Sequence, residues 1–286
     1  MQVLRHKTAA HFLAQASHWL EQAEAENNLI LGIAAFFESY GGQPKIEPYF
    51  LAVQDDGVIV GTALMPPPRR LLITRMPDPP VALLAEYLLA AKAQVSGVLG
   101  PRDCTRVFAE NWHAHTRISS RLKMRERIYA CASVIPPVLS AGYLRTATSD
   151  DESLLVEWVG EFCREAHTED ETAYMQSQIP TLIKKDCLYV WENGEVVSMA
   201  DLRRETAHGI AVSLVYTPPR WRNKGYATSC VAQLTQQMLD NGKQFCCLFT
   251  DLANPTSNGI YRRIGYREIC DVDDWIFEQG TSFQAS

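Results

Sequence analysis

Two β-hairpin signals at equivalent points of the chain constrain its fold most. Asp55-Asp56-Gly57 separates two apolar runs, Asn193-Gly194 separates another pair, and Gly194 follows Gly57 by 137 positions. Asp-Gly and Asn-Gly tolerate the positive φ angles that a two-residue hairpin turn needs. The apolar pattern around the two turns also matches. This spacing predicts one α/β plan that is used twice.

Hydrophobic periodicity fills in both halves around these hairpins. The first half predicts helix 12–23, a helix after 28, hairpin strands 49–54 and 58–64, strand 71–74, helix 79–95, strand 97–100, helix 101–115 and closing strand 127–135. The second half predicts an extended segment 143–148, two helices ending near 185, hairpin strands 187–191 and 196–202, strand 209–216, helix 225–239, strand 245–250, helix 258–264 and a last strand that ends at 274–277.

Local signals add three details. Ser149-x-x-Glu152 has the pattern of a capping box and predicts a helix start. The basic segment 121–127 is expected to be solvated and to precede the closing strand. The two prolines of Ile135-Pro136-Pro137 neither continue a helix nor fit a central strand. We therefore expect two domains, 1–137 and 138–286.

Composition is typical of a folded globular protein. Of the 286 residues, 47% are hydrophobic and 21% are charged, which excludes a disordered or collagen-like chain. No apolar stretch reaches the about 20 residues of a membrane span, and the first eight residues do not lead into a signal-peptide core. The eight cysteines contain no Cys-x-x-Cys pair, and His113 and His115 have no third ligand nearby. We expect no metal site, no disulfide framework, a cytoplasmic location and a monomer or homodimer.

The negative charge is concentrated in the second half. Residues 1–140 have a net charge of +2 and residues 141–286 have −8, and segment 150–171 holds nine acidic residues against Arg164 alone. An acidic face repels nucleic acid and attracts small cations, although a solvated helix face would give the same pattern. We expect neither a nucleic-acid partner nor a membrane partner.

The strongest functional signal lies between Val215 and Ala227, which reads V-Y-T-P-P-R-W-R-N-K-G-Y-A. An apolar strand breaks there at two prolines and enters a helix through Gly225. Helix N-termini have N–H groups without carbonyl partners and carry partial positive charge, so this turn suits a phosphate or pyrophosphate. Gly225 would allow close backbone approach. The spacing is neither that of a P-loop nor that of a dinucleotide turn.

Here the chain resembles the GNAT superfamily of N-acetyltransferases, over residues 143–280. The family's pyrophosphate turn, Arg/Gln-x-x-Gly-x-Gly/Ala, is matched by Arg222, Gly225 and Ala227. Its second pattern, Asn-x-x-Ala/Ser-x-x-x-Tyr-x-x-x-Gly-Phe/Tyr, is matched by Asn254, Ser257, Tyr261, Gly265 and Tyr266. The resemblance implies an α/β fold of two tandem GNAT-like domains, each with a mixed, mostly antiparallel sheet flanked by helices.

The resemblance also implies the cofactor, acetyl-CoA (CoA), and the residues that would hold it. The strand Val215-Tyr216-Thr217 would pair with the pantetheine amides, and Asn254 and Ser257 would contact the pantetheine arm. Tyr261, the expected catalytic residue, would lie near the sulfur and either supply the proton that the departing thiolate needs or hydrogen-bond the sulfur. The pyrophosphate would bind to Arg222, Asn223, Lys224, Gly225, Tyr226, Ala227 and Thr228.

The general base stays open. An attacking amine must be neutral, although alkylamines have a pKa of about 10.4. Many relatives place a Glu on the strand before the turn, where this chain has Ala211-Val212-Ser213-Leu214. The candidates, each of which also fits a surface position and could act through water, are Glu165, Glu192, Asp201, Glu205 and His208. A substrate that arrives already deprotonated would need no base, so none is assigned.

Three functions remain in view. The favoured one is an acetyl-CoA-dependent N-acyltransferase that acetylates the primary amine of a small acceptor, for which the acidic segment suggests a cation. The alternative is a CoA-responsive binding or regulatory protein without turnover. A transferase that uses aminoacyl-tRNA is disfavoured by the charge of −8. The first half lacks the turn glycine after strand 71–74 and has Asp78 there, so we expect it not to bind CoA.

Overall fold

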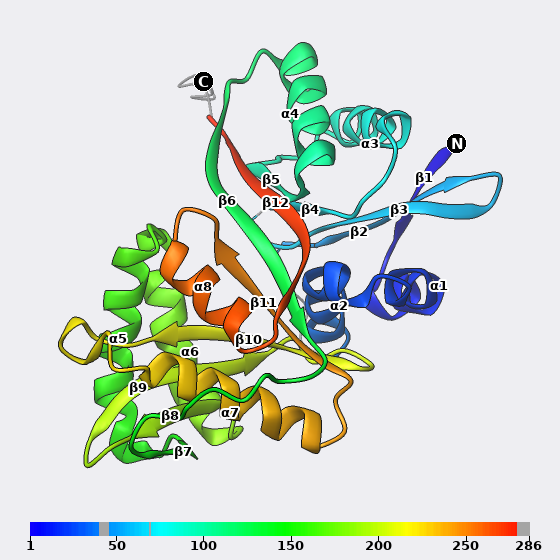
Figure 1. The fold of residues 1–286 in the computed structure, drawn as a ribbon. Helices are drawn as coiled ribbons and strands as arrows, with labels where there is room; N and C mark the ends of the chain where they lie inside the picture. The colour runs from blue at the N-terminus through cyan, green and yellow to red at the C-terminus, as the bar shows by residue number, and fades with distance from the viewer. Residues whose placement is uncertain (40–45, 69, 279–286) are drawn as a thin grey trace. The chain divides into compact units, whose positions relative to one another are not determined.

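The computed structural model describes residues 1–39, 46–68 and 70–278 (Figure 1). The first series of elements is β1 (Gln2–His6), α1 (Ala9–Glu21), α2 (Glu24–Ser39), β2 (Tyr49–Asp55), β3 (Val58–Met65), β4 (Arg70–Ile73), α3 (Asp78–Ala90), β5 (Gly97–Pro101), α4 (Arg102–Thr116) and β6 (Ser120–Cys131). The second series is β7 (Tyr143–Thr146), α5 (Glu152–Glu165), α6 (Thr172–Lys184), β8 (Leu188–Glu192), β9 (Val196–Arg203), β10 (Gly209–Tyr216), α7 (Tyr226–Asp240), β11 (Phe245–Asp251), α8 (Pro255–Arg263) and β12 (Arg267–Phe277). Apart from short 3-10 turns, the two series have the same order, so the duplicated α/β plan is confirmed.

The chain folds into two compact units that exchange segments. The first contains the described residues of 1–128, 250–254 and 269–278, and the second contains 129–249 and 255–268. Most of β12 therefore belongs to the first unit, where Val272–Ile276 pair antiparallel with Gly97–Pro101 of β5. The end of β6, Tyr129–Cys131, belongs to the second unit. This division differs from a single cut after residue 137.

Ion pairs attach β12 to the first unit. Arg102 contacts Asp271 at 3.0 Å and Asp273 at 3.2 Å, and Arg127 also binds Asp271. Asp273 is buried, so its charge requires a partner. The acidic run of β12 thus meets arginines of α4 and β6.

In the first unit, the strand order is β1-β2-β3-β4-β5-β12, and the pair β4–β5 is parallel. Helices cover both faces of this sheet. Phe50, Leu64 and Leu72 form one core with α1 and α2. Leu51, Ala63 and Leu71, which point to the other face, pack with α3 and α4.

The second unit repeats this arrangement with the order β11-β10-β9-β8-β7, and the pair β10–β11 is parallel. Leu188, Met199 and Tyr216 pack with α5 and α6 on one face. Alternate residues of the same strands, such as Tyr189 and Val212, pack with α7 and α8 on the other face. Each unit thus has one parallel pair of strands in an otherwise antiparallel sheet, which agrees with the predicted fold class.

Three local predictions were wrong. Residues 121–127 are not a solvated segment before the strand, because β6 already begins at Ser120. The capping box lies one residue earlier than expected: the Thr148 side chain accepts from the backbone of Asp151, and the Asp151 side chain accepts from the backbone of Thr148. The helix expected to reach 95 ends at Ala90.

Among the helices of the described residues, none combines the length and the apolar character needed to cross a membrane.

Candidate functional site

The end of β10 is held in place by β9. The hydroxyl of Ser198, which is fully buried, donates to the Tyr216 carbonyl at 3.0 Å and lies 2.9 Å from Thr217 Oγ1. Pairing with β9 shifts register between Ser213 and Tyr216, and Leu214 in this bulge has a φ of +47°. Bulges turn backbone groups away from the regular ladder and are common next to active sites.

On its other side, β10 pairs with β11 only along its first three residues, and both strands continue beyond the ladder. The parallel ladder to β11 joins Gly209–Ala211 to Phe245–Cys247, whereas β10 continues to Tyr216. The backbone from Val212 to Tyr216 therefore lies beyond this ladder. An extended polar chain could use those N–H and C=O groups as an additional strand would.

The turn after β10 begins α7 without a capping side chain. Gly225 is the N-cap with a φ of +80°, and Asn223 has a φ of +61°. The first N–H groups of α7 are therefore left to face a ligand. A Cβ on Gly225 would lie 2.7 Å from Ser140 Oγ, which donates to the Lys224 carbonyl at 2.7 Å. The turn is closely packed against Ser140, and its N–H groups could bind an anion.

The basic side chains of this turn contact protein groups. Arg222 donates through Nη2 to both Glu165 oxygens at 2.7 Å and through Nε to the Thr217 carbonyl at 2.8 Å. Lys224 Nζ lies 4.5 Å from the centre of the Trp221 ring. The bond to Glu165 was not predicted, because the two residues are far apart in the sequence.

Tyr226, Ala227 and Thr228 form the first turn of α7. Tyr226 is buried, and its hydroxyl accepts from Asn193 Nδ2 at 2.9 Å. The hairpin turn that contains Asn193 therefore positions the first residue of the helix. Sequence reasoning missed Asn193, Ser140 and Ser198, because their contacts are tertiary.

Tyr261 lies on α8 with its ring buried between two other tyrosines. The ring centres of Tyr129 and Tyr266 are 6.4 and 5.8 Å away. Burial, followed by the nearby Cys230, raises the pKa of the Tyr261 phenol. The phenol thus stays protonated at neutral pH and makes no hydrogen bond that we find to the described residues. It is a hydrogen-bond donor without an acceptor among the described residues.

The two remaining predicted contacts are on and before α8. Ser257 is in the first turn of α8. Asn254 precedes α8 and belongs to the segment Thr250–Asn254 of the first unit. The second unit thus contains residues 215–228, Ser257 and Tyr261. Asn258, one turn before Tyr261, was missed: its Oδ1 accepts from the Tyr129 hydroxyl at 3.1 Å.

The candidate bases have different surroundings. Glu192 is bound by Arg145 and Tyr143, which lower its pKa, and Glu205 is bound by Lys243. Glu165 is bound by Arg222. His208 is exposed. Asp201 has no exposed surface, and burial raises its pKa while Arg203 opposes that effect. Within the described ranges, no three potential ligand side chains gather as a metal site requires.

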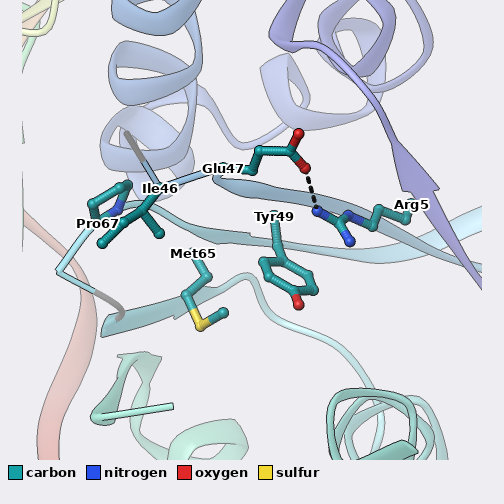
Figure 2. A pocket seen from close by; sticks show the side chains of 6 residues that line it. All are labelled: Arg5, Ile46, Glu47, Tyr49, Met65 and Pro67. Atoms are coloured by element: carbon teal, nitrogen blue, oxygen red, sulfur yellow. Dashed lines mark hydrogen bonds and ion pairs between the residues drawn. The ribbon is translucent and has the colours of Figure 1, made fainter. Parts of the chain in front are cut away.

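The first unit lacks an equivalent turn. After β4, the helix α3 begins with Asp78, followed by Pro79 and Pro80. The prolines have no N–H to donate, and Asp78 repels an anion. A pocket of about 270 Å³ lies elsewhere in this unit (Figure 2). There Arg5 contacts Glu47 at 3.3 Å and stacks 4.0 Å from the centre of the Tyr49 ring.

Comparison with known proteins identifies one domain of the chain. Residues 153–266 match the model of the acetyltransferase (GNAT) family. This stretch is a GNAT acetyltransferase domain. It includes every predicted site residue from Val215 to Tyr261. A search of curated proteins returned no significant match.

Solved GNAT structures resemble the whole chain. One from Sphaerobacter thermophilus has 17% identity and a TM-score of 0.61, and the match covers 99% of this chain and 98% of that one. One from Colwellia psychrerythraea has 11% identity and a TM-score of 0.60, covering 97% and 100%. A tandem GNAT protein from the clavulanic acid biosynthesis pathway has 12% identity and a TM-score of 0.56, covering 99% of both chains. At these identities the likeness shows the fold, which is a tandem GNAT fold. A GNAT acetyltransferase domain at residues 153–266 implies acetyl transfer that depends on an acyl-CoA.

Proposed function

We propose that this protein is an acetyl-CoA-dependent N-acetyltransferase that acetylates the primary amine of a small acceptor. The observation that carries the proposal is the uncapped start of α7 at Gly225, which follows a strand that pairs with its parallel neighbour only along its first three residues. A pyrophosphate and an extended pantetheine arm need these two features side by side. The GNAT assignment of residues 153–266 supports it.

The residues fit this cofactor. The N–H groups of residues 225–228 would bind the pyrophosphate, and Val215-Tyr216-Thr217 would pair with the pantetheine amides. We assign Arg222, Asn223 and Lys224 to the same turn, and Asn254 and Ser257 to the pantetheine arm. Bound acetyl-CoA supplies a thioester whose acetyl group is transferred to the amine.

The chain's own groups then act on charges and protons. The backbone N–H near Val215, at the bulge around Leu214, would donate to the acetyl oxygen as it gains negative charge. Tyr261 holds a proton at neutral pH, as its burial requires, and would give it to the sulfur. The acidic segment 150–171 favours an acceptor amine that arrives as a cation.

We assign this chemistry to the predicted catalytic domain, 138–286, and propose that the domain 1–137 binds no CoA. The prolines after Asp78 support the second assignment. We further propose a protein that acts on small molecules, as a monomer or homodimer, without nucleic acid or membrane partners.

Thermal shift and CoA release test the function together. Acetyl-CoA and CoA should raise the melting temperature, because a ligand that binds only the native state stabilises it. ATP, which lacks the pantetheine arm, is the matched control and should stabilise much less. Free CoA should then appear when a primary amine is added. Absence of stabilisation would reject the cofactor assignment, and binding without CoA release for any amine would favour a CoA-responsive binding protein.

A further inference from the structure

Two neighbouring polar atoms on β9 are buried without partners. Asp201 Oδ2 accepts from Arg203 Nε, but Asp201 Oδ1 and Arg203 Nη2 have no hydrogen-bond partner among the residues that the structure describes. Asp201 is 0% exposed, and the Arg203 side chain is 21% exposed. Burying an unpaired carboxylate oxygen and an unpaired guanidinium nitrogen is unfavourable. One molecule that donates to the first and accepts from the second would satisfy both.

Both side chains point to the sheet face that carries α5 and α6. Met199 packs with residues of α5, whereas Ala200 and Leu202 pack with α7. Because side chains alternate along a strand, Asp201 and Arg203 lie on the Met199 face.

Small residues lie opposite this pair on β10. Ser213 is directly across from Asp201, and Ala211 is across from Arg203. Ser213 is partly exposed, at a point where β10 pairs with β9 and its ladder to β11 has already ended. Solvent therefore reaches β10 at Ser213, beside the pair.

The order of these residues along the strands gives a ligand a direction. Ser213 precedes Val215 by two residues, and Ala211 precedes it by four. At about 3.3 Å per residue, the level of Arg203 lies about 7 Å further from Val215 than the level of Asp201. A small molecule with its amine at Asp201 and its anionic group at Arg203 would point the amine toward Val215.

We propose that Asp201 and Arg203 form the acceptor subsite and that the acceptor carries a carboxylate beside its amine, as an amino acid does. The proposal rests on the N-acetyltransferase function proposed above. Arg203 Nε keeps its bond to Asp201 Oδ2, while Arg203 Nη2 donates to the acceptor carboxylate and Asp201 Oδ1 accepts from the ammonium group. Burial raises the pKa of Asp201, which suits a proton acceptor.

The proton balance is simple. The ammonium group gives one proton to Asp201 Oδ1 and becomes a neutral amine. The N–C bond then forms as the C–S bond breaks. The sulfur receives a proton from Tyr261, and the second proton that leaves the nitrogen replaces it. The products are an N-acetyl amino acid and free CoA.

The test compares amino acids with the amines that lack only the carboxylate: alanine with ethylamine, ornithine with 1,4-diaminobutane, and lysine with 1,5-diaminopentane. CoA release gives kcat/KM for each. We expect at least one amino acid to exceed its partner by about 10- to 100-fold, the range of a charged hydrogen bond. Arg203→Gln should reduce that ratio to about 2-fold by lowering activity on the amino acid alone. Arg204→Gln is the control: the Arg204 guanidinium lies 5.6 Å from the centre of the Phe249 ring, and its charge also lowers the pKa of Asp201. Its loss should affect the amino acid and the amine alike and so preserve the ratio.

Asp201→Asn gives a second readout. We expect a folded variant, checked by its melting temperature and acetyl-CoA binding, whose kcat no longer falls at acidic pH. A water molecule bridging the two atoms would also satisfy them; in that case Arg203→Gln would leave the ratio unchanged and the proposal is rejected. A preference for the diamines in the unchanged protein also rejects it but leaves the transferase function intact. No CoA release with any amine would instead refute the transferase function.

Discussion

Replacement of Gly225 by alanine tests the turn on which the proposed cofactor site depends. The glycine has a φ of +80°, in the left-handed region that side chains disfavour. The added Cβ would lie 2.7 Å from Ser140 Oγ. Ser140 cannot easily retreat, because its own N–H donates to Ser229 Oγ at 2.8 Å. Either the backbone angle or the Ser140 hydroxyl has to change.

The cost follows from these two contacts. An alanine in the left-handed region costs about 1–2 kcal/mol. Rotating the Ser140 hydroxyl away breaks its bond to the Lys224 carbonyl, worth about 1 kcal/mol. The unfolding free energy should therefore fall by about 2–3 kcal/mol. If the turn yields, its N–H groups no longer converge, and the acetyl-CoA Kd should rise about tenfold, the equivalent of 1.4 kcal/mol.

Urea denaturation and calorimetric titration with acetyl-CoA measure the two effects. Gly242, at the other end of α7, is the matched control: its φ is +94°, and a Cβ there would meet nothing within 4 Å. Gly242→Ala should lose only the backbone share, about 1–2 kcal/mol, without a change in Kd. The Ser140→Ala change should couple to Gly225→Ala, so that the double variant is about 1 kcal/mol more stable than the sum of the single changes predicts.

Two results would contradict this prediction. Equal stability losses at Gly225 and Gly242, with no coupling to Ser140, would show that the turn is not closely packed. An unchanged acetyl-CoA Kd in a destabilised Gly225→Ala variant would show that the pyrophosphate does not bind there.

Three further predictions concern Tyr261, Glu165 and Asp151. Tyr261→Phe should lower kcat about 100-fold, because it removes the proposed proton donor. Stability and the acetyl-CoA Kd should change little, since the Tyr261 hydroxyl has no hydrogen-bond partner among the described residues. An unchanged kcat would exclude a role as proton donor. Glu165→Gln should tighten acetyl-CoA binding about 2- to 5-fold, because it frees Arg222. Glu161→Gln, which removes an acceptor of the Tyr216 hydroxyl, is the control and should leave the Kd unchanged. Equal Kd values for the two variants and the unchanged protein would contradict this prediction. The hydrogen bonds from Arg145 lower the pKa of Asp151, so the contribution of the Asp151 carboxylate to the unfolding free energy is complete above about pH 3.9 and is lost as the pH falls through its lower native pKa. Below pH 4, the unfolding free energy from urea denaturation should therefore depend less on pH in Asp151→Asn than in the unchanged protein. Parallel curves for the two proteins would refute this prediction.

The sequence predicted the order of elements well, because hairpin turns and hydrophobic periodicity are local properties. It did not predict the partner of β12, since alternation shows which residues share a face but not which strand lies alongside. The start of β6 did have a signal: Leu122 and Met124 alternate with Arg121, Lys123 and Arg125, the period of a strand. The basic character of that segment obscured it.

At the site, the motif residues could be predicted because the turn and its helix are contiguous in the chain. The groups that hold the turn could not. Ser140 is 84 residues from Lys224, whose carbonyl it binds, and Glu165 is 57 residues from Arg222. Such contacts depend on how the elements pack, which no spacing in the sequence encodes.

These contacts also indicate which part of the turn would recognise an anion. Glu165 takes two bonds from Arg222, and Lys224 lies over Trp221, so two of the turn's cations already interact with the protein itself. The backbone around Gly225 has no such competitor, since no side chain caps α7. Backbone N–H groups and the helix dipole would then provide most of the attraction. The GNAT pattern that the chain resembles has the same preference, since the position of Arg222 also accepts a neutral Gln whereas the position of Gly225 accepts only glycine.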